Sequence, residues 1–574
     1  MKKNTILLLV ILIIVLIVLF ATIFLLNYRK NTTLEEYYGI YSLENHSIDL
    51  WVQEGEYISI YCTECDELVY KGKPNYDLNF KLNKEQDGYI VMSAGKAAQN
   101  EIIVIPQTYN GLPVTEIQSL NPEYIIIPDL YDGGMMNYKY EESNIKTVFI
   151  SPSVKYLNEF LVCDKLETVY IPSGLLEMET WTFSNCNSLK NIYVSSDNPN
   201  YKSENGILYT KNGSKLIRFG ANRSDISFEV PNEVTVISQK AFSNASNLKS
   251  ITLSDSLTTI ELSAFEGCTS LENIVISNSV TSINGGAFRD CISLESVSIG
   301  NGVQELGRLV FYGCKSLKDI TVDQNNLYFS SLDGNLYDKD GYTLIRYAIG
   351  NTQNSFSIPS GVITIGTFSF EGAEHLKEII FSETVTTIKG NAFHRALSLE
   401  IIHLPTSLKN IEENAFDSLT KIKEVHIKSL SSWLEVEHKG LYSSPFCDSA
   451  DLYVNGELLE HLEIPSYVSE ISGSSFMGCQ SIKTVIISGA TQTIGQSAFF
   501  GCKSIESVDI KDGVKSIEGS AFYGCSSLKE VNIPVSVKYI GDYAFYKCTS
   551  LKSLGLPYPL LIKVDMDRIF SNTP

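Results

Sequence analysis

The sequence is poor in positive charge. Its 45 lysines and arginines are outnumbered by 66 aspartates and glutamates, which gives a formal net charge of −21 at pH 7. A protein surface that is negative over most of its area repels the phosphates of DNA and RNA. We therefore expect no nucleic-acid partner.

The sequence also lacks the short motifs that mark common catalytic centres. It contains no nucleophile elbow, no phosphate-binding loop and no His-Glu-x-x-His pair. Asp338-Lys-Asp340-Gly341 matches only the first residues of a calcium loop and lacks the distal glutamate, so we interpret it as a turn. We predict a protein that is not an enzyme and that needs no cofactor or resident metal.

What the sequence has in quantity is one repeated unit. In the C-terminal copies a phenylalanine recurs every 23 residues, and each is followed three residues later by a cysteine: Phe476 and Cys479, Phe499 and Cys502, Phe522 and Cys525, Phe545 and Cys548. The same signature recurs upstream at Phe160, Phe183, Phe242, Phe265, Phe288, Phe311, Phe370, Phe393 and Phe416. A pattern that returns at a fixed period predicts a solenoid in which each turn packs on its neighbours.

The repeat itself carries a family resemblance. In the clearest copy it reads Leu528-Lys-Glu-Val531-Asn-Ile533-Pro534, followed by Val537, Ile540 and Ala544-Phe545 leading to Cys548. This motif, which recurs in register more than ten times, resembles the BspA-like class of bacterial leucine-rich repeat proteins. The resemblance implies an arc-shaped repeat domain that is displayed outside the cell and used for adhesion or recognition. It implies no particular ligand.

The alternation of residues within the repeat predicts the fold independently. Leu248-Lys-Ser-Ile251-Thr-Leu253 alternates as a short strand with one buried face does, and stacked turns would align such strands in parallel. The Ala-Phe-x-x-Cys stretch fits a short helical or irregular return. We predict a leucine-rich repeat solenoid with one short parallel strand per repeat, a β-rich N-terminal region and an N-terminal transmembrane helix.

Changes in the pattern divide the chain into segments. The predicted segments are a membrane anchor at 1–30, an N-terminal capping region at 31–144, the repeat array at 145–556 with insertions near 196–230, 323–358 and 429–463, and a tail at 557–574. The first two insertions are homologous, and their Asn212-Gly213 and Asp340-Gly341 pairs predict β-hairpins, because tight turns need positive φ. We expect both hairpins to project from the edge of the repeats.

An apolar stretch near the N-terminus predicts the anchor. Ile6–Leu26 is interrupted only by Thr22, and as a helix rising about 1.5 Å per residue it spans roughly 30 Å of hydrocarbon. A cleaved signal peptide has a shorter apolar core and a small-x-small site, which the sequence around Ala21-Thr-Ile23 does not offer. We predict an uncleaved, single-pass anchor with the repeats on the extracellular side, and a cleaved secretory signal is the alternative.

The cysteines fall into two classes. Those of the repeats share a position that other repeats fill with Ala245, Ala373, Ala396 or Leu419, which predicts buried free thiols in a small core site. Cys62-Thr-Glu-Cys65 has the spacing of a redox or metal pair, but zinc needs four ligands and no second close pair follows in the N-terminal region. We predict a local disulfide there, with structural thiols and a zinc or oxidoreductase site as alternatives.

A candidate binding surface lies at the position between the two apolar residues of the strand. In the first three turns this outward position holds Phe149, Tyr170 and Tyr193, flanked by Thr168 and Asn191. A ladder of exposed rings beside a hydroxyl and an amide suits stacking on sugars or holding an extended peptide. The alternative is cross-strand aromatic packing that stabilises the sheet.

His403 and His426 occupy the same outward position in two later turns. Strands lie about 4.8 Å apart, so the two imidazoles could share one cation, but third and fourth ligands are not identifiable. Together these observations predict a cell-surface protein that binds an extracellular protein or glycan without turnover. The alternatives are a self-associating envelope spacer without a specific ligand, and an enzyme that uses the Cys62-Cys65 dithiol.

Overall fold

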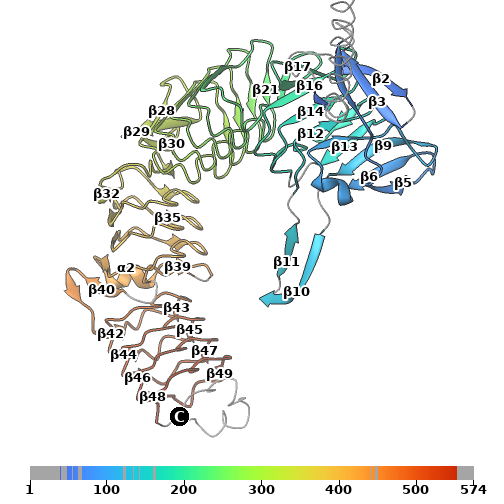
Figure 1. Cartoon of the computed structure of the whole chain (residues 1–574). Helices are drawn as coiled ribbons and strands as arrows, with labels where there is room; N and C mark the ends of the chain where they lie inside the picture. Colours follow the sequence, from blue (N-terminus) through green and yellow to red (C-terminus); the bar gives the residue numbers. More distant parts are fainter. Residues whose placement is uncertain are drawn as a thin grey trace, which may run out of the picture. The chain divides into compact units, whose positions relative to one another are not determined.

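The computed structural model describes residues 39–40, 48–54, 56–62, 67–120, 124–132, 135–140, 143–159, 163–440, 442–446 and 450–552. The predicted anchor Ile6–Leu26 and tail 557–574 lie outside them. The chain divides into two compact units, one of Met1–Ser224 with Glu233–Ala245 and one of Asp225–Asn232 with Ser246–Pro574 (Figure 1). Each unit is described by itself below.

The first unit begins with a small antiparallel sheet. Its strands, in spatial order, are β1 (Gly39–Ile40), β4 (Leu68–Gly72), β3 (Tyr57–Cys62) and β2 (Ile48–Glu54). A hairpin that the sequence did not predict pairs β10 (Tyr124–Asp132) with β11 (Met135–Tyr140). A 3-10 turn, η1, covers Gly95–Gln99.

The repeats of the first unit build two sheets. The front sheet is parallel and consists of β7 (Ile102–Val104), β12 (Thr147–Phe149), β14 (Thr168–Ile171) and β16 (Asn191–Val194). The side sheet consists of β5 (Asn79–Leu82), β6 (Tyr89–Ser93), β9 (Leu112–Ser119), β13 (Tyr156–Glu159) and β15 (Glu177–Met178), with β8 (Thr108–Tyr109) paired to β9. The front sheet starts within the segment 31–144, because β7 pairs in parallel with β12.

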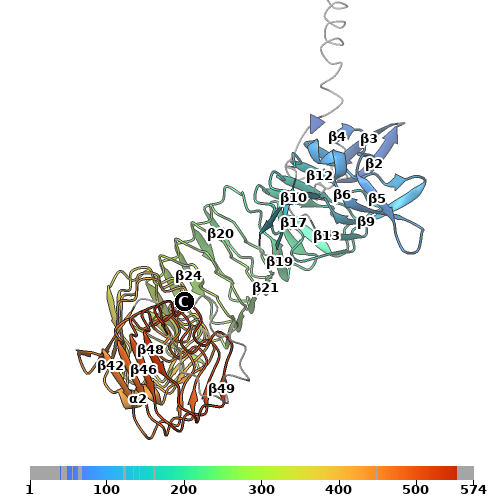
Figure 2. The same ribbon diagram turned by 90° about the horizontal axis from the view of Figure 1, so that it is seen from below.

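The second unit repeats this arrangement over many turns, which Figure 2 shows at β20 and β24. Its front strands are β20 (Ser227–Glu229), β22 (Ser250–Thr252), β24 (Asn273–Ile276), β26 (Ser296–Ile299), β28 (Asp319–Val322), β32 (Ser355–Ser357), β34 (Glu378–Ile380), β36 (Ile401–Leu404), β38 (Glu424–Ile427), β40 (Asp451–Val454), β42 (His461–Ile464), β44 (Thr484–Ile487), β46 (Ser507–Ile510) and β48 (Glu530–Asn532).

Most turns also carry a second strand of two residues. These side strands are β23 (Thr259–Ile260), β25 (Ser282–Ile283), β27 (Glu305–Leu306), β33 (Thr364–Ile365), β35 (Thr387–Ile388), β37 (Asn410–Ile411), β39 (Glu437–His438), β43 (Glu470–Ile471), β45 (Thr493–Ile494), β47 (Ser516–Ile517) and β49 (Tyr539–Ile540). The prediction of one strand per repeat is therefore incomplete, because a two-residue strand is too short to show alternation. The returns are turns, and the described residues contain one short α-helix, α2 (Leu430–Leu434).

The core is held by a phenylalanine ladder with a cysteine beside each ring. Phe499 stacks between Phe476 and Phe522, with ring centroids 5.3 and 5.2 Å apart. The Cys502 thiol donates to the Phe476 carbonyl oxygen at 3.0 Å, which links successive turns. Cys502 and Cys525 are buried free thiols, so that prediction is confirmed for them. Burial also raises the pKa of Cys479 to about 11 and keeps its thiol protonated at neutral pH.

The first two insertions are hairpins, as predicted, but they do not stand away from the repeats. The first consists of β17 (Tyr201–Glu204), β18 (Ile207–Thr210) and β19 (Lys215–Arg218), and the second of β29 (Phe329–Leu332), β30 (Asn335–Asp338) and β31 (Thr343–Arg346). Gly213 and Gly341 have the positive φ that the turns require. However, β19 pairs in parallel with β21 (Val236–Ile237), and β31 with β33, so each hairpin ends as a side strand.

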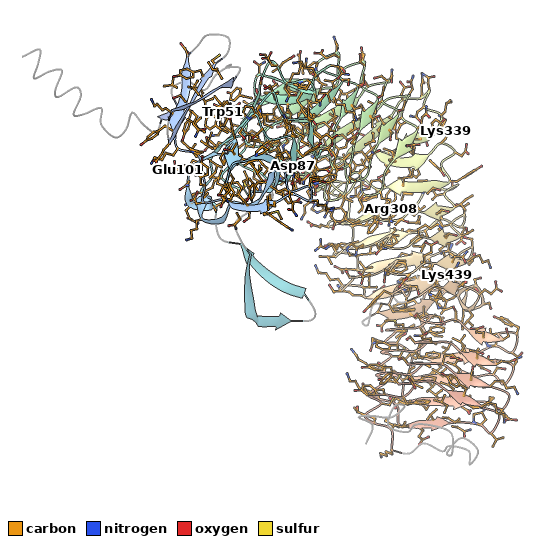
Figure 3. The ribbon with its side chains drawn as sticks, turned by 90° about the vertical axis from the view of Figure 1, so that its right-hand side faces the viewer. Trp51, Asp87, Glu101, Arg308, Lys339 and Lys439 are labelled. Carbon is orange, nitrogen blue, oxygen red and sulfur yellow. The ribbon has the colours of Figure 1, made fainter. Side chains whose placement is uncertain are left out.

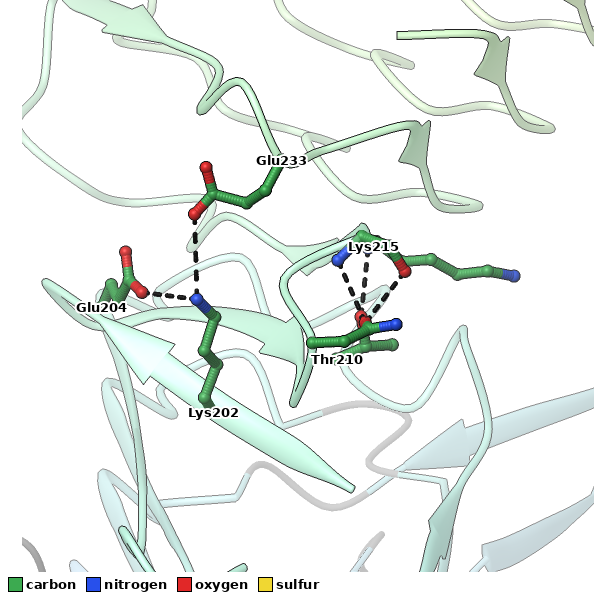
Figure 4. Close-up of polar contacts among 7 residues, drawn as sticks. Lys202, Glu204, Thr210, Lys215 and Glu233 are labelled. Carbon is green, nitrogen blue, oxygen red and sulfur yellow. Dashed lines mark hydrogen bonds and ion pairs between the residues drawn. The ribbon is translucent and has the colours of Figure 1, made fainter. Parts of the chain in front are cut away.

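Polar contacts fix the first hairpin to its own turn (Figure 4). Lys202 Nζ lies 2.6 Å from Glu204 Oε1 and 3.8 Å from Glu233 Oε1, so one ammonium joins two parts of the unit. The Lys215 amide donates to Thr210 Oγ1 at 3.1 Å across the hairpin turn. The third insertion differs: it contains α2 and a short hairpin of β40 with β41 (Glu457–Leu458).

Candidate functional site

The predicted ladder of the first unit is buried. Phe149, Tyr170 and Tyr193, here called the covered ladder, are 0%, 4% and 9% exposed. They form one hydrophobic cluster with residues of β3 and β4, namely Ile58, Ile60, Cys62, Val69 and Tyr70. Trp51 of β2, labelled in Figure 3, packs on the same cluster. The prediction that these rings face solvent is wrong, because the small N-terminal sheet has an apolar face that the ladder buries.

The rings of the covered ladder also stack on one another. Phe149 and Tyr170 stack with centroids 4.5 Å apart and planes 1° apart, and Tyr170 and Tyr193 follow at 5.3 Å. Tyr70 covers Phe149 at 4.9 Å. A ring whose two faces are in contact with other rings presents no face to a sugar. Burial raises the pKa of Tyr170 well above its ordinary value, so its hydroxyl stays neutral.

The flanking residues of this ladder have structural partners. Thr168 is 8% exposed, and Asn191 Oδ1 accepts a hydrogen bond from Arg223 Nη1 at 3.3 Å. Arg223 Nη1 also donates to the Asn205 carbonyl oxygen at 2.7 Å. A ligand role for Phe149, Tyr170, Tyr193, Thr168 and Asn191 stays a prediction, and it requires that the small sheet be displaced first.

The second unit presents a similar ladder that is not covered in this way. His403 of β36, His426 of β38 and Tyr453 of β40, here called the open ladder, are aligned by the parallel register of their strands. Their rings stack with centroids 4.5 and 4.7 Å apart. The side chains of His403 and His426 are 35% and 24% exposed, and Tyr453 is partly exposed. The open ladder is therefore accessible where the covered ladder is not.

Two glutamates lie along the open ladder. His403 Nε2 is 3.0 Å from Glu378 Oε1, and His426 Nε2 is 2.8 Å from Glu424 Oε2. Hydrogen bonds from Ser355 and then from His403 hold the pKa of Glu378 below its ordinary value. The Glu378 carboxylate therefore stays ionised at neutral pH and gives the face negative charge.

Apolar side chains extend the open ladder at both ends. Ile380 of β34 pairs with His403 and is 38% exposed, and Leu458 of β41 pairs with Tyr453 and is 43% exposed. Asp451 lies beside Glu424 in the neighbouring row, and burial together with Glu424 raises its pKa. The result is a continuous strip of apolar and aromatic side chains with carboxylates on one flank.

The sequence singles out both histidines of the open ladder, but not Tyr453. The third insertion separates Tyr453 from the regular period, and this hides the fact that its strand continues the front sheet. The signal was present in Asp451-Leu-Tyr-Val454, which has the alternation of the other front strands. No group of three or more His, Cys, Asp and Glu side chains within the described ranges is placed to hold a metal ion.

Two further predictions fall at or beyond the limits of the described residues. Cys62 ends β3 and is buried, whereas Cys65, the other half of the predicted disulfide, lies outside those residues. Within the same ranges, none of the helices has the length and apolar character needed to cross a bilayer.

Several solved structures resemble this chain at low sequence identity and low TM-score. A leucine-rich repeat protein from Bacteroides ovatus is 20% identical, covers 87% of this chain and 98% of its own, and has a TM-score of 0.38. The pneumococcal vaccine antigen PcpA is 19% identical, with 82% and 93% covered and a TM-score of 0.33. A leucine rich cell surface protein from Faecalibacterium prausnitzii is 18% identical, with 92% and 98% covered and a TM-score of 0.28.

No curated protein matches the sequence. The model of the BspA type leucine rich repeat region matches in six copies, over residues 121–206, 219–332, 347–437 and 449–573. These segments make up more than half of the chain and contain both the covered and the open ladder. The chain therefore belongs to the family of BspA type leucine-rich repeat proteins.

Proposed function

We propose that this protein is a non-enzymatic cell-surface protein that binds an extracellular protein through the open ladder of its second unit. The observation that carries the proposal is the accessible strip from Ile380 to Leu458, with His403, His426 and Tyr453 between them. A rigid sheet face of this kind offers many weak contacts, so affinity comes from the extent of the surface.

The chemistry of the strip favours a protein over a glycan. Because the rings stack on one another, they present edges and polar atoms, whereas sugar stacking needs an open ring face. Glu378, Glu424 and Asp451 favour a partner with lysine or arginine side chains. The proposed partner is an extracellular protein with a basic surface patch, and a glycan is the second choice.

A binding screen with matched variants tests this proposal. Purified protein is passed over immobilised extracellular proteins, and any partner found is measured again with Glu424→Gln and with His426→Ala. Both variants should weaken binding, and raised salt should weaken the wild type as well, because the contact is charged. Tyr170→Phe, in the covered ladder, should bind as the wild type does. Equal affinity of all variants would contradict the proposal.

Self-association is the alternative function. The chain would then act as an envelope spacer or scaffold without a specific ligand. Concentration-dependent assembly in sedimentation experiments, together with no partner in the screen, would favour that reading. Assembly that is lost in His426→Ala would place the self-contact on the open ladder.

Surface display is a separate part of the proposal. Its support is the apolar stretch Ile6–Leu26, whose length suits a single membrane crossing. Protease treatment of intact cells should release peptides from the repeats. Full protection of the repeats in unlysed cells would contradict outward display and would indicate an internal scaffold.

A further inference from the structure

The second insertion leaves a pocket in the side of the second unit. β27 is the last strand of its sheet, and β29 is the first strand of the next, so the row of side strands is broken at this point. A pocket of about 210 Å³ lies at the break. One wall comes from residues 306–312, and the other from Leu336, Ile345, Arg346, Thr367 and Phe368.

A buried arginine lines this pocket. Arg346 is 6% exposed; its Nη1 donates to the Phe368 carbonyl oxygen at 2.9 Å and its Nη2 to the Phe311 carbonyl oxygen at 3.1 Å. Glu371 Oε2 lies 3.6 Å from Nη2 and balances part of the charge. The Arg346 Nε–H has no hydrogen-bond partner among the described residues. The buried end of the pocket wall therefore holds one donor without a partner among the described residues.

A second arginine in the lining is exposed. Arg308, labelled in Figure 3, lies over the Phe368 ring with its guanidinium carbon 5.9 Å from the ring centroid. Nearby lysines of the same unit pair with glutamates, as Lys315 does with Glu374 at 2.7 Å. No ion pair within the described ranges involves Arg308. Its guanidinium is thus open to an anion.

The surroundings concentrate positive charge in an acidic protein. Arg395 Nη1 lies 3.2 Å from the Tyr312 hydroxyl, and Arg289 lies over the Tyr312 ring at 4.9 Å. Together with Arg308 and Arg346, these two make up half of the arginines in the chain. Glu371 pairs with Arg346, whereas Glu266 and Asp290 pair with Arg289. Among the residues that the structure describes, no carboxylate pairs with Arg308.

Much of the rest of the lining is apolar. Leu309, Val310, Ile345 and Phe368 line the same pocket as Arg308 and Arg346. We propose that this pocket binds the carboxylate of a small ligand that also carries an apolar group, as the last residue of a peptide or a free acylated amino acid does. The pocket size suits one such residue. This site is separate from the open ladder and does not depend on the proposed function.

The first insertion supplies an internal control. It has the same architecture, and Arg218 is buried where Arg346 lies. However, Thr180 occupies the position of Arg308, and Lys240 that of Phe368. Lys240 and Phe368 both have a φ of 57°, so the two backbones adopt the same conformation there. Arg308→Thr and Phe368→Lys therefore place residues in the pocket that the same scaffold already accepts.

The experiment is a calorimetric titration of the full chain with N-acetyl-L-leucine and with its uncharged amide, N-acetyl-L-leucinamide. The acid should bind and the amide should bind at least tenfold more weakly. Arg308→Thr should lower the affinity for the acid at least tenfold. Lys318→Thr, which changes a nearby lysine outside the lining, should leave that affinity unchanged. No binding of the acid, or equal binding of acid and amide, would overturn the proposal.

A second titration separates the two sources of the carboxylate. The tripeptide Gly-Gly-Leu carries the same terminal residue on a peptide chain. Binding of the tripeptide at least as tightly as the acylated amino acid indicates a peptide C-terminus, and weaker binding indicates a free small molecule. Unfolding of each variant in urea is measured alongside, because a variant that does not fold would lose binding of N-acetyl-L-leucine whatever the role of Arg308. Wild-type affinity in folded Arg308→Thr would contradict the proposal.

Discussion

The two ladders occupy the same strand position in the two units, yet they differ in what lies on them. The covered ladder is at most 9% exposed and packs against Ile60 and Val69 of the small sheet. In the open ladder His403 and His426 keep about a quarter to a third of their side chains exposed. The repeat sequence sets how the rings stack, whereas segments outside the repeat pattern decide whether solvent reaches them.

The largest difference is expected when a central ring is removed from each ladder. Tyr170→Ala should destabilise the first unit by roughly 3–5 kcal/mol, because a buried ring leaves a cavity between two stacked neighbours. His426→Ala in the open ladder should cost less than about 1 kcal/mol. Urea unfolding of both variants measures the difference.

Tyr170→Phe is the control for that pair. The Tyr170 hydroxyl is buried without a hydrogen-bond partner among the described residues. Removing it should leave stability unchanged or raise it by about 1 kcal/mol, because an unsatisfied buried hydroxyl is costly. Equal losses in Tyr170→Ala and His426→Ala would show that the small sheet does not cover the first ladder.

The next largest difference between the two units is expected in how their stability depends on acid pH. His438 in the second unit is buried beside Trp433, and burial lowers its pKa to about 4 from an ordinary 6.5. The His438 imidazole binds a proton below pH 6.5 in the unfolded chain but only near pH 4 in the folded chain. Stability is therefore lost as the pH falls from 6.5 to 4. The loss should reach roughly 3 kcal/mol. Chemical unfolding at a series of pH values measures it, and His438→Leu should remove this part of the dependence.

A smaller effect is expected on binding. For any partner from the screen, His426→Ala should lower affinity about tenfold, which corresponds to about 1.4 kcal/mol. The same partner should bind Tyr170→Phe unchanged. Loss of binding in Tyr170→Phe but not in His426→Ala would reverse the comparison and would give the ligand role to the covered ladder.

The smallest effect should be the same in both units. Lys190 pairs with Glu167 in the first unit and Lys529 with Glu506 in the second, in each case between successive turns at the surface. Lys190→Ala and Lys529→Ala should produce no measurable change in the midpoint of thermal unfolding, because exposed ion pairs contribute little. A clear shift in only one of the units would show that its surface pairs are coupled to its core.

Local repetition explains what the sequence could predict. Each phenylalanine and cysteine of the ladder meets its own equivalent in the next turn, so the contact of Cys502 with the Phe476 carbonyl is implicit in the period. The hairpin turns were predictable because Gly213 and Gly341 mark positive φ. The open ladder was partly predictable, since His403 and His426 lie one period apart.

Long-range contacts explain what the sequence could not predict. The burial of Phe149 depends on Ile60 and Tyr70, which come from a segment without the repeat pattern. No alternation in that segment says which face it will cover. The pocket at Arg346 depends on where a hairpin interrupts the side strands, which is a property of the stack and not of one repeat.

The most direct test of the difference between the ladders is hydroxyl-radical footprinting of the folded protein, read residue by residue by mass spectrometry. Oxidation of His403, His426 and Tyr453 should be rapid, and oxidation of Phe149, Tyr170 and Tyr193 should be slow until the protein unfolds. Rapid oxidation of Tyr170 in the folded protein, at a rate close to that of Tyr453, would contradict the account.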